Sequence, residues 1–266
     1  MARLVLGGTH MKNRVFWILV SVGFLAATLF AWKLAADAKL INPLWFPGPD
    51  KSFRVLAGWI DSGELWDPLG KTVWRMFAGW IAATVAGVAL GAAIASSAFA
   101  RELFEPSAEF LRPLPASAIL PPAILVLGFS DAMIVFVVAF GSVWPILLGA
   151  IHGFKSVDPR LTEVARMLRL TSWARAWKIQ LPNALPDIFA GMRVSISIAL
   201  IITVASEMLS SQQGVGYMML VAARAFRSAD IFAGIVVLGV LGYLTNATMQ
   251  KLEDWLLRWR PASVGA

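Results

Sequence analysis

The sequence has no cysteine and only two histidines among its 266 residues. Without cysteine, the chain can form no disulfide, no thiolate metal site and no cysteine nucleophile. A metal site or protease motif built on a histidine pair is equally implausible, because His10 and His152 are far apart in the sequence. We therefore expect no metal site in this chain.

Charged residues are also scarce, at 15% of the chain, whereas 58% of the residues are hydrophobic. The mean hydropathy is +0.71. A soluble domain of this length needs more polar surface, so the composition predicts a protein that lies in a lipid bilayer.

Long apolar runs predict six membrane-spanning helices in one all-α domain, residues 1–266. Five of the runs approach the ~20 residues that a bilayer core requires. The sixth, residues 104–129, is apolar but interrupted by four prolines, which a span tolerates only where neighbouring groups satisfy the freed backbone. The five uninterrupted runs are residues 15–32, 73–100, 132–151, 188–209 and 231–249.

The distribution of lysine and arginine predicts the orientation of these spans. With the N-terminus in the cytoplasm, 15 of the 23 basic residues fall in cytoplasmic segments and 8 on the other side. Because cytoplasmic loops carry the excess of Lys and Arg, both termini are expected in the cytoplasm. The sequence pI of about 10.1 then reflects membrane topology, and no nucleic-acid partner is expected.

Two further patterns concern helix surfaces. Residues 42–70, predicted outside, hold a short amphipathic helix with Phe53 and Ile60 on its apolar face, which suits the outer membrane interface. The second span carries a small residue at every fourth position, which lets another helix approach closely. This stripe consists of Gly79, Ala83, Gly87, Gly91 and Ala95.

Residues 153–187 form the most basic segment, and they predict a cytoplasmic helical hairpin. Asp158 and Pro159 suit the start of its first helix. Thr171 or Ser172 can cap a second, which Pro182 is expected to stop. By residue chemistry alone, the hairpin is either an interfacial pair of helices that meets anionic membrane lipid or a knob that docks into a cytoplasmic partner.

The hairpin resembles the "EAA" loop of binding-protein-dependent ABC transporter permeases. That pattern is E-A-A, three residues, G, nine residues and I-x-L-P. Glu163 and Ala165 match its start, and Ile179, Leu181 and Pro182 fall at the required spacing. Val164 replaces the first alanine, and Arg169 occupies the glycine position, where a positive φ costs roughly 1 kcal/mol.

Three surrounding stretches resemble the branch of that family that imports aliphatic sulfonates, taurine and nitrate. They are "RPLPASAILPPAILVLGFSD" (112–131), "GFKSVDPRLTEVAR" (153–166) and "SEMLSSQQGVGYMM" (206–219). The resemblance extends from about residue 42 to the last span.

This resemblance implies a type I ABC importer permease fold with a cytoplasmic coupling-helix hairpin, in a bacterial inner membrane. The implied partners are a cytoplasmic ATPase, an extracytoplasmic binding protein and a second permease copy, most simply a homodimer. ATP and Mg would be bound by the ATPase, so this chain would be a transport subunit without catalytic residues or a cofactor. The implied coupling residues are Glu163, Ala165, Leu168, Arg169, Ile179, Leu181 and Pro182.

Ionisable residues near the apolar runs are further candidates, because such groups are costly in a membrane. Glu207, near the outer end of the fifth span, is expected to act as a gate or to pair with Arg224 or Arg227. Glu109 is most simply part of the cytoplasmic entrance of the third span, and Asp131 is most simply interfacial.

Two other functions are compatible with a chain of several membrane spans. An ion-coupled secondary transporter usually has acids deep in several spans and often an inverted repeat. A non-transporting membrane scaffold stays open on sequence physics, but it does not explain the spacing from Glu163 to Pro182.

Overall fold

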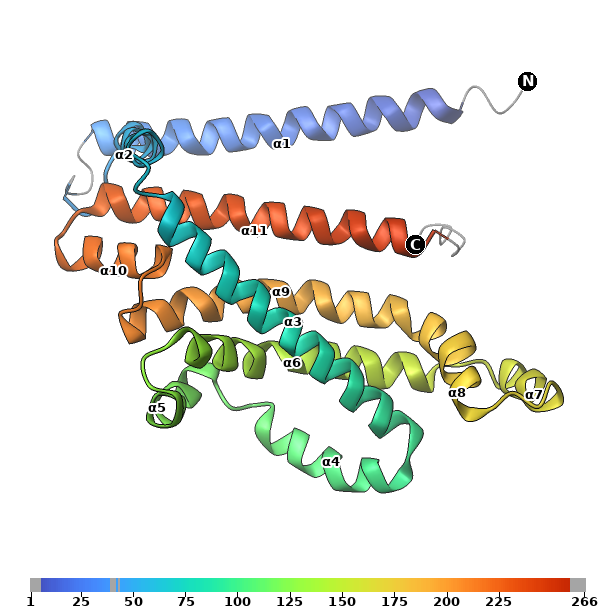
Figure 1. The fold of residues 1–266 in the computed structure, drawn as a ribbon. Coiled ribbons are helices and arrows are strands. Elements are labelled where there is room, and N and C mark those ends of the chain that lie inside the picture. The colour runs from blue at the N-terminus through green and yellow to red at the C-terminus, as the bar shows by residue number, and fades with distance from the viewer. Residues whose placement is uncertain (1–5, 39–41, 43, 259–266) are drawn as a thin grey trace. The chain divides into compact units, whose positions relative to one another are not determined.

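The computed structural model describes residues 6–38, 42 and 44–258. The described chain is helical and contains no strand. Five of its helices are long and apolar enough to cross a membrane, or six if one bent pair counts as a single span, which confirms the predicted all-α membrane fold. The chain separates into two compact units, Met1–Gly63 with Met219–Ile235 and Glu64–Met218 with Val236–Ala266, and each is described by itself (Figure 1).

The first unit contains α1 (Leu6–Asp37), α2 (Pro49–Ser62), most of α10 (Val215–Arg224) and the start of α11 (Ser228–Leu256). Its parts meet in an aromatic cluster, in which the ring centroid of Trp32 lies 5.8 Å from that of Phe46 and 5.2 Å from that of Phe232. The Trp32 indole N–H also donates to the Pro47 carbonyl at 3.0 Å. The α2 helix is the predicted amphipathic helix, and its Phe53 and Ile60 remain exposed.

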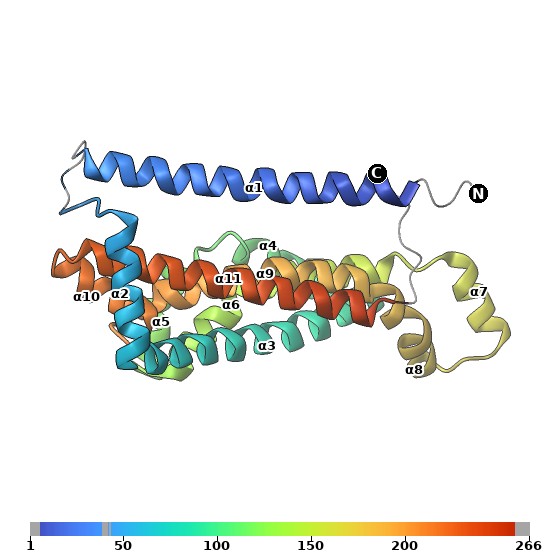
Figure 2. The same ribbon diagram turned by 90° about the horizontal axis from the view of Figure 1, so that it is seen from above.

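The core of the second unit is three long helices, α3 (Trp66–Ser96), α6 (Asp131–Lys155) and α9 (Leu181–Ser210), which lie side by side (Figure 2). Gly79 faces Val138 and Gly91 faces Ala150, so α3 and α6 run in the same direction. In contrast, Gly153 lies against Ala184, whereas Gly191, further along α9, lies against Pro145. The α9 helix therefore runs opposite to α6.

The stripe of small residues on α3 faces α6. A β-carbon on Gly79 would lie 2.6 Å from the Cβ of Val138, and one on Gly91 would lie 2.5 Å from the Cβ of Ala150. Ala83 is buried between them, Gly87 meets Ile146, and Ala95 at the end of the stripe is only partly buried. The two helix backbones can approach this closely only because these positions have little or no side chain.

The third predicted span is not one helix. It starts earlier than expected, at Ala98, and consists of α4 (Ala98–Leu111) and α5 (Ala116–Leu127), which are bent by 102°. Pro113 and Pro115 lie in the break, and neither has an N–H to continue the α4 hydrogen bonds. The α3 helix correspondingly stops at Ser96, because Ser97 is extended and caps α4 by accepting from the Ala100 N–H at 3.3 Å.

The segment between α6 and α9 forms the predicted hairpin. It consists of α7 (Pro159–Met167), α8 (Ser172–Arg175) and a π-helical turn, η1 (Ala176–Gln180), which continues directly into α9. The hairpin lies at the end of the second unit where α6 finishes and α9 begins (Figure 1).

Candidate functional site

The start of the hairpin is built as its sequence predicts. The Asp158 carboxylate accepts from the Arg160 N–H at 2.8 Å, and Pro159 occupies the first helical position, where no N–H is needed. Thr171 begins the second helix, since its hydroxyl accepts from the Ala174 N–H at 3.2 Å.

The turn between the two short helices has the geometry for which the family favours glycine. Arg169 has a φ of 50°. Its N–H donates to the Arg166 carbonyl, and the Leu170 N–H donates to the Ala165 carbonyl, both at 3.0 Å. These two bonds form a Schellman motif with Arg169 in the left-handed position. The chain thus keeps the family turn and tolerates the strain of a side chain there.

Pro182 does not stop the second helix, contrary to the prediction. The Leu181 N–H instead donates five residues back, to Ala176, in the π-helical turn. Pro182 then lies in the first turn of α9, where its missing N–H leaves no bond unmade. The hairpin and α9 therefore form one continuous helical segment.

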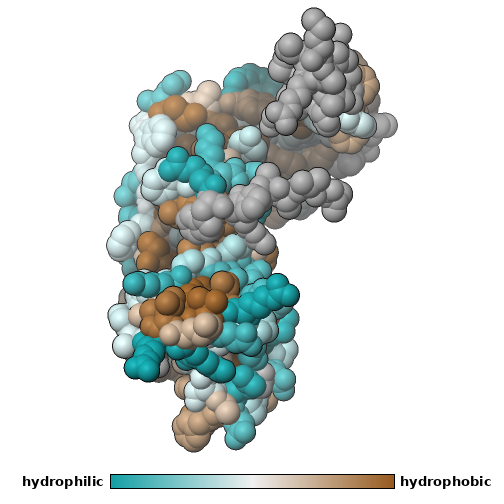
Figure 3. All heavy atoms as spheres, turned by 90° about the vertical axis from the view of Figure 1, so that its right-hand side faces the viewer, coloured by the Kyte–Doolittle hydropathy of each residue, from teal (hydrophilic) through white to brown (hydrophobic). Residues whose placement is uncertain are grey.

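The tip of the hairpin exposes large apolar side chains. Leu168 is 66% exposed, and Met167 and Trp173 are exposed still further. Trp173 and Trp177 stack edge to face, with ring centroids 5.4 Å apart. Figure 3, which looks onto this end of the molecule, shows apolar side chains gathered among strongly polar ones. An apolar patch with a polar rim is typical of an interaction surface.

The other coupling candidates occupy the body of the hairpin. Glu163 is exposed on α7, whereas Ala165 is buried. Ile179, Leu181 and Pro182 are partly buried at the root.

The root is fastened to α6. The Asn183 amide N–H₂ donates to the Gly153 carbonyl at 3.1 Å and to the Ser156 hydroxyl at 3.0 Å. A β-carbon on Gly153 would lie 2.7 Å from the Cα of Ala184, so the two backbones are in close contact. The root of the hairpin is therefore held against both α6 and α9.

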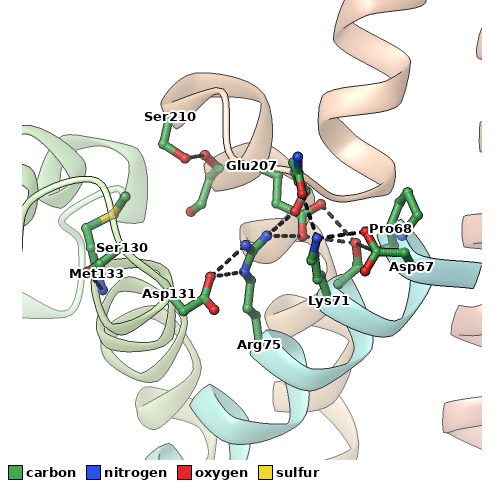
Figure 4. Close-up of polar contacts among 12 residues, drawn as sticks. Asp67, Pro68, Lys71, Arg75, Ser130, Asp131, Met133, Glu207 and Ser210 are labelled. Atoms are coloured by element: carbon green, nitrogen blue, oxygen red, sulfur yellow. Dashed lines mark hydrogen bonds and ion pairs between the residues drawn. The ribbon is translucent and has the colours of Figure 1, made fainter.

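The opposite end of the second unit contains a buried ion cluster, formed by Arg75, Asp131 and Glu207 (Figure 4). Arg75 is only 3% exposed, and its Nη1 donates to Glu207 Oε1 at 3.0 Å. Its Nε and Nη2 both donate to Asp131 Oδ1, at 2.8 and 2.6 Å. Three helices, α3, α6 and α9, thus each contribute one charged side chain to the cluster.

Glu207 is completely buried and receives donors besides Arg75. The Thr72 hydroxyl donates to the carboxylate at 2.9 Å, and the Gly216 N–H donates to Oε2 at 3.0 Å. Arg75 Nη1 also donates to the Gln213 carbonyl at 2.6 Å. A β-carbon on Gly214 would lie within 2.2 Å of the Glu207 carboxylate. The cluster therefore fixes the loop between α9 and α10 to the ends of the helices.

The cluster corrects one sequence-based expectation, the partner of Glu207. Glu207 does form a salt bridge, but its partner is Arg75 rather than Arg224 or Arg227, and Arg227 instead pairs with Asp230 at 3.1 Å. Asp131 lies at the first residue of α6 and is more than half exposed, as expected of an interfacial residue, and it also pairs with Arg75 at 2.6 Å. Sequence reasoning did not single out Arg75, although it lies one turn before Gly79 on the stripe of small residues.

Neither candidate site has the composition of a metal centre. Within the described residues, no group of three His, Cys, Asp or Glu side chains is arranged to hold a metal ion.

Comparison with known proteins is consistent with this arrangement. Residues 83–259 match the family described as "Binding-protein-dependent transport system inner membrane component". A putative aliphatic sulfonates transport permease protein of Bacillus subtilis is 31% identical over 240 residues, which cover 90% of this chain and 87% of the relative. A taurine transport system permease protein of Escherichia coli is 27% identical over 248 residues, or 91% and 90% of the two chains.

A solved structure is similar in fold. The crystal structure of an amino acid ABC transporter with histidines superposes with a TM-score of 0.60, covering 77% of this chain and 98% of that chain. At 16% sequence identity, this likeness concerns the fold alone.

Proposed function

Because this chain belongs to the binding-protein-dependent transport system inner membrane component family, as an ABC importer permease of the sulfonate, taurine and nitrate branch, we propose that it forms the translocation path of an ATP-driven importer. The observation that carries the proposal is the exposed apolar tip of the hairpin. The apolar side chains of the tip lie on a short hairpin that is hydrogen-bonded to α6 and continuous with α9. A partner that binds the hairpin could therefore move these two long helices.

The proposed partner at the hairpin is a separate cytoplasmic ATPase. Leu168 and Met167 would enter an apolar groove of that subunit, and basic residues such as Arg166 and Arg169 would lie at the rim. The ATPase would bind ATP and Mg, so this chain needs no cofactor of its own. Closure of two ATPases would drive two permease copies between inward-open and outward-open states.

The hairpin then faces the cytoplasm, and both termini lie on the same side of a bacterial inner membrane. The excess of basic residues on the hairpin side supports this orientation. The Arg75 cluster consequently lies at the outer end of the helices, where an extracytoplasmic binding protein would deliver the substrate. As long as the cluster is intact, it holds the outer ends of α3, α6 and α9 together, which suits a gate.

The substrate class that we propose is a small oxoanion, with sulfonates first. This choice follows the two relatives, a putative aliphatic sulfonates transport permease protein and a taurine transport system permease protein. The binding protein would supply most of the selectivity.

The first test is replacement of Leu168 by aspartate. A charge at this position should prevent docking in an apolar groove, so the tagged permease should lose the co-purifying ATPase while its amount in the membrane stays unchanged. Leu168→Met is the matched control, because it keeps an apolar side chain of similar volume, and it should retain the ATPase. Unchanged co-purification with Leu168→Asp would refute the coupling role.

A second measurement addresses transport. The permease, its ATPase and the binding protein encoded beside it are reconstituted in liposomes, and ATP turnover is measured with sulfonates, taurine and nitrate. Turnover that rises only with a loaded binding protein supports the importer, whereas turnover that responds to none of these oxoanions would reject the proposed substrate class.

A further inference from the structure

A cavity of about 570 Å³ lies between α3, α4 and α6 in the second unit. This volume is in the range of small-molecule sites. Most of its wall is apolar, with Ile94 from α3 and Leu147, Leu148 and Ile151 from α6. Two charged residues, Glu109 and Arg112, line it from the C-terminal end of α4.

The cavity reaches the middle of the helices. Trp144 lines it and lies near the centre of the 25-residue α6. At 1.5 Å per residue, Trp144 is about 16 Å from the C-terminal end of α6, roughly half the thickness of a ~30 Å hydrocarbon core. Glu109 and Arg112 line this same cavity from α4.

Glu109 and Arg112 are both exposed on the protein surface that lines the cavity, and neither forms an ion pair with any side chain that the structure describes. The Trp144 indole Nε1 in the same wall is buried and has no hydrogen-bond partner among the described residues. Ionisable residues in an apolar segment of a membrane protein are costly unless they serve a water-filled path or a ligand. Their position beside the break between α4 and α5 is typical of transporter sites, which use discontinuous helices near the midplane.

The pairing of charges narrows the chemistry of the ligand. Arg112 offers a planar guanidinium that matches the oxygens of an oxoanion. Glu109 lies three residues earlier, on the same side of the helix, and would repel an anion that carried no positive group. A nitrate-like ion would also leave the apolar wall without contacts. A zwitterion with a short methylene chain satisfies Arg112, Glu109 and the apolar wall together.

We propose that this cavity holds the substrate part-way across the membrane, and that the substrate is a zwitterionic aminoalkanesulfonate whose sulfonate binds Arg112 and whose ammonium binds Glu109. This inference rests on the proposed function and narrows its substrate class.

The test is direct binding to the purified permease–ATPase complex, without the binding protein. Radiolabelled taurine is used in equilibrium dialysis, with ethanesulfonate as the competitor that lacks the ammonium group. Arg112→Gln should weaken taurine binding at least tenfold. Glu109→Gln should weaken taurine binding by a similar factor while ethanesulfonate competes as well as before or better.

The matched control is Glu102→Gln, because Glu102 is an exposed acid on the same helix that does not line the cavity. Its taurine affinity should equal that of the wild type. Taurine binding that is unchanged in Arg112→Gln would overturn the proposal. A co-purified phospholipid that is lost from Arg112→Gln, with no taurine binding in the wild type, would also overturn it and identify a lipid site.

Failure of this inference is distinguishable from failure of the proposed function. An importer whose ATP turnover responds to sulfonates, but whose Arg112→Gln variant binds taurine normally, refutes the cavity assignment alone. A permease that co-purifies no ATPase refutes the proposed function.

Discussion

Arg75 is the one positively charged side chain in the described part of the chain that pairs with Glu207. Its replacement by methionine removes this charge and keeps an unbranched side chain in its place. Glu207, which is completely buried, would retain the Thr72 hydroxyl and the Gly216 N–H as donors but no counter-charge. Asp131 is more than half exposed and can be rehydrated, so it should contribute little to the loss. The cost therefore falls mainly on Glu207.

The magnitude follows from burial. Removing one partner of a buried ion pair costs about 3–5 kcal/mol, because the other charge is left in a medium of low dielectric. The pair between Arg54 and Asp50 has the same 3.0 Å separation, but Arg54 is 78% exposed. An exposed pair of this kind contributes about 0–1 kcal/mol. Arg54→Met is thus a matched control, with equal geometry and a different environment.

The measurement is the free energy of unfolding of the detergent-solubilised permease, obtained from titration with SDS in mixed micelles and followed by circular dichroism. Arg75→Met should lose several kcal/mol and Arg54→Met less than about 1 kcal/mol. The double variant Arg75→Met with Glu207→Met should recover most of the loss, because it removes the unpaired buried carboxylate.

Two results would refute this reasoning. A loss from Arg75→Met as small as that from Arg54→Met would mean that water reaches Glu207 despite its burial. A double variant no more stable than Arg75→Met alone would mean that the loss comes from packing of the arginine side chain and not from an uncompensated charge.

The remaining predictions use the same unfolding assay. Arg169→Gly should stabilise the protein by about 0.5–1 kcal/mol, since glycine adopts the left-handed turn without strain, and a loss of stability would show that the arginine side chain makes a compensating contact. Gly79→Ala should destabilise by about 1–3 kcal/mol, because its methyl group would overlap Val138. Val138→Ala should relieve only part of that overlap, because it removes the γ-carbons of Val138 and keeps the Cβ at 2.6 Å. Gly58→Ala, with open space around the new methyl group, should be neutral or stabilising; equal effects at the two glycines would contradict the close approach of α3 and α6.

Much of the fold was predictable because apolar length and helix-start chemistry act locally. The apolar runs located the spans, and Asp158 with Pro159 located the first residue of α7. The prolines near residue 113 predicted an interruption, but the bend of 102° depends on what α4 and α5 pack against, which no local pattern contains.

The prediction at Pro182 failed for a different local reason. A proline ends a helix only if the hydrogen bond that its N–H would make is needed. Here the π-helical turn shifts the bonding pattern by one residue just before Pro182, so the proline begins α9 without a broken bond. A hydrophobicity pattern does not contain this shift.

The ion cluster contains a contact between residues that are far apart in the sequence, which sequence patterns do not predict. Arg75 lies four positions before Gly79, so it continues the spacing of the stripe of small residues by one turn. Its burial against α6 could therefore have been predicted from this spacing alone. Its pairing with Glu207 could not, because the two residues are separated by 132 positions and meet only after α3 and α9 pack. Arg224 and Arg227 were nearer in sequence and suggested the wrong partner.

The continuity of the hairpin with α9 has a mechanical consequence. The α9 helix has 30 residues and is about 45 Å long, with the hairpin at one end and Glu207 near the other. A small tilt at its base is therefore amplified into a displacement of several ångströms at its tip, which is enough to separate a 3.0 Å ion pair. If α9 tilts in this way, its close contacts with α6 at Gly149, Gly153 and Gly191 lie between the hairpin and Glu207, so a variant that loosens one of them should change how far the tip moves without altering either end.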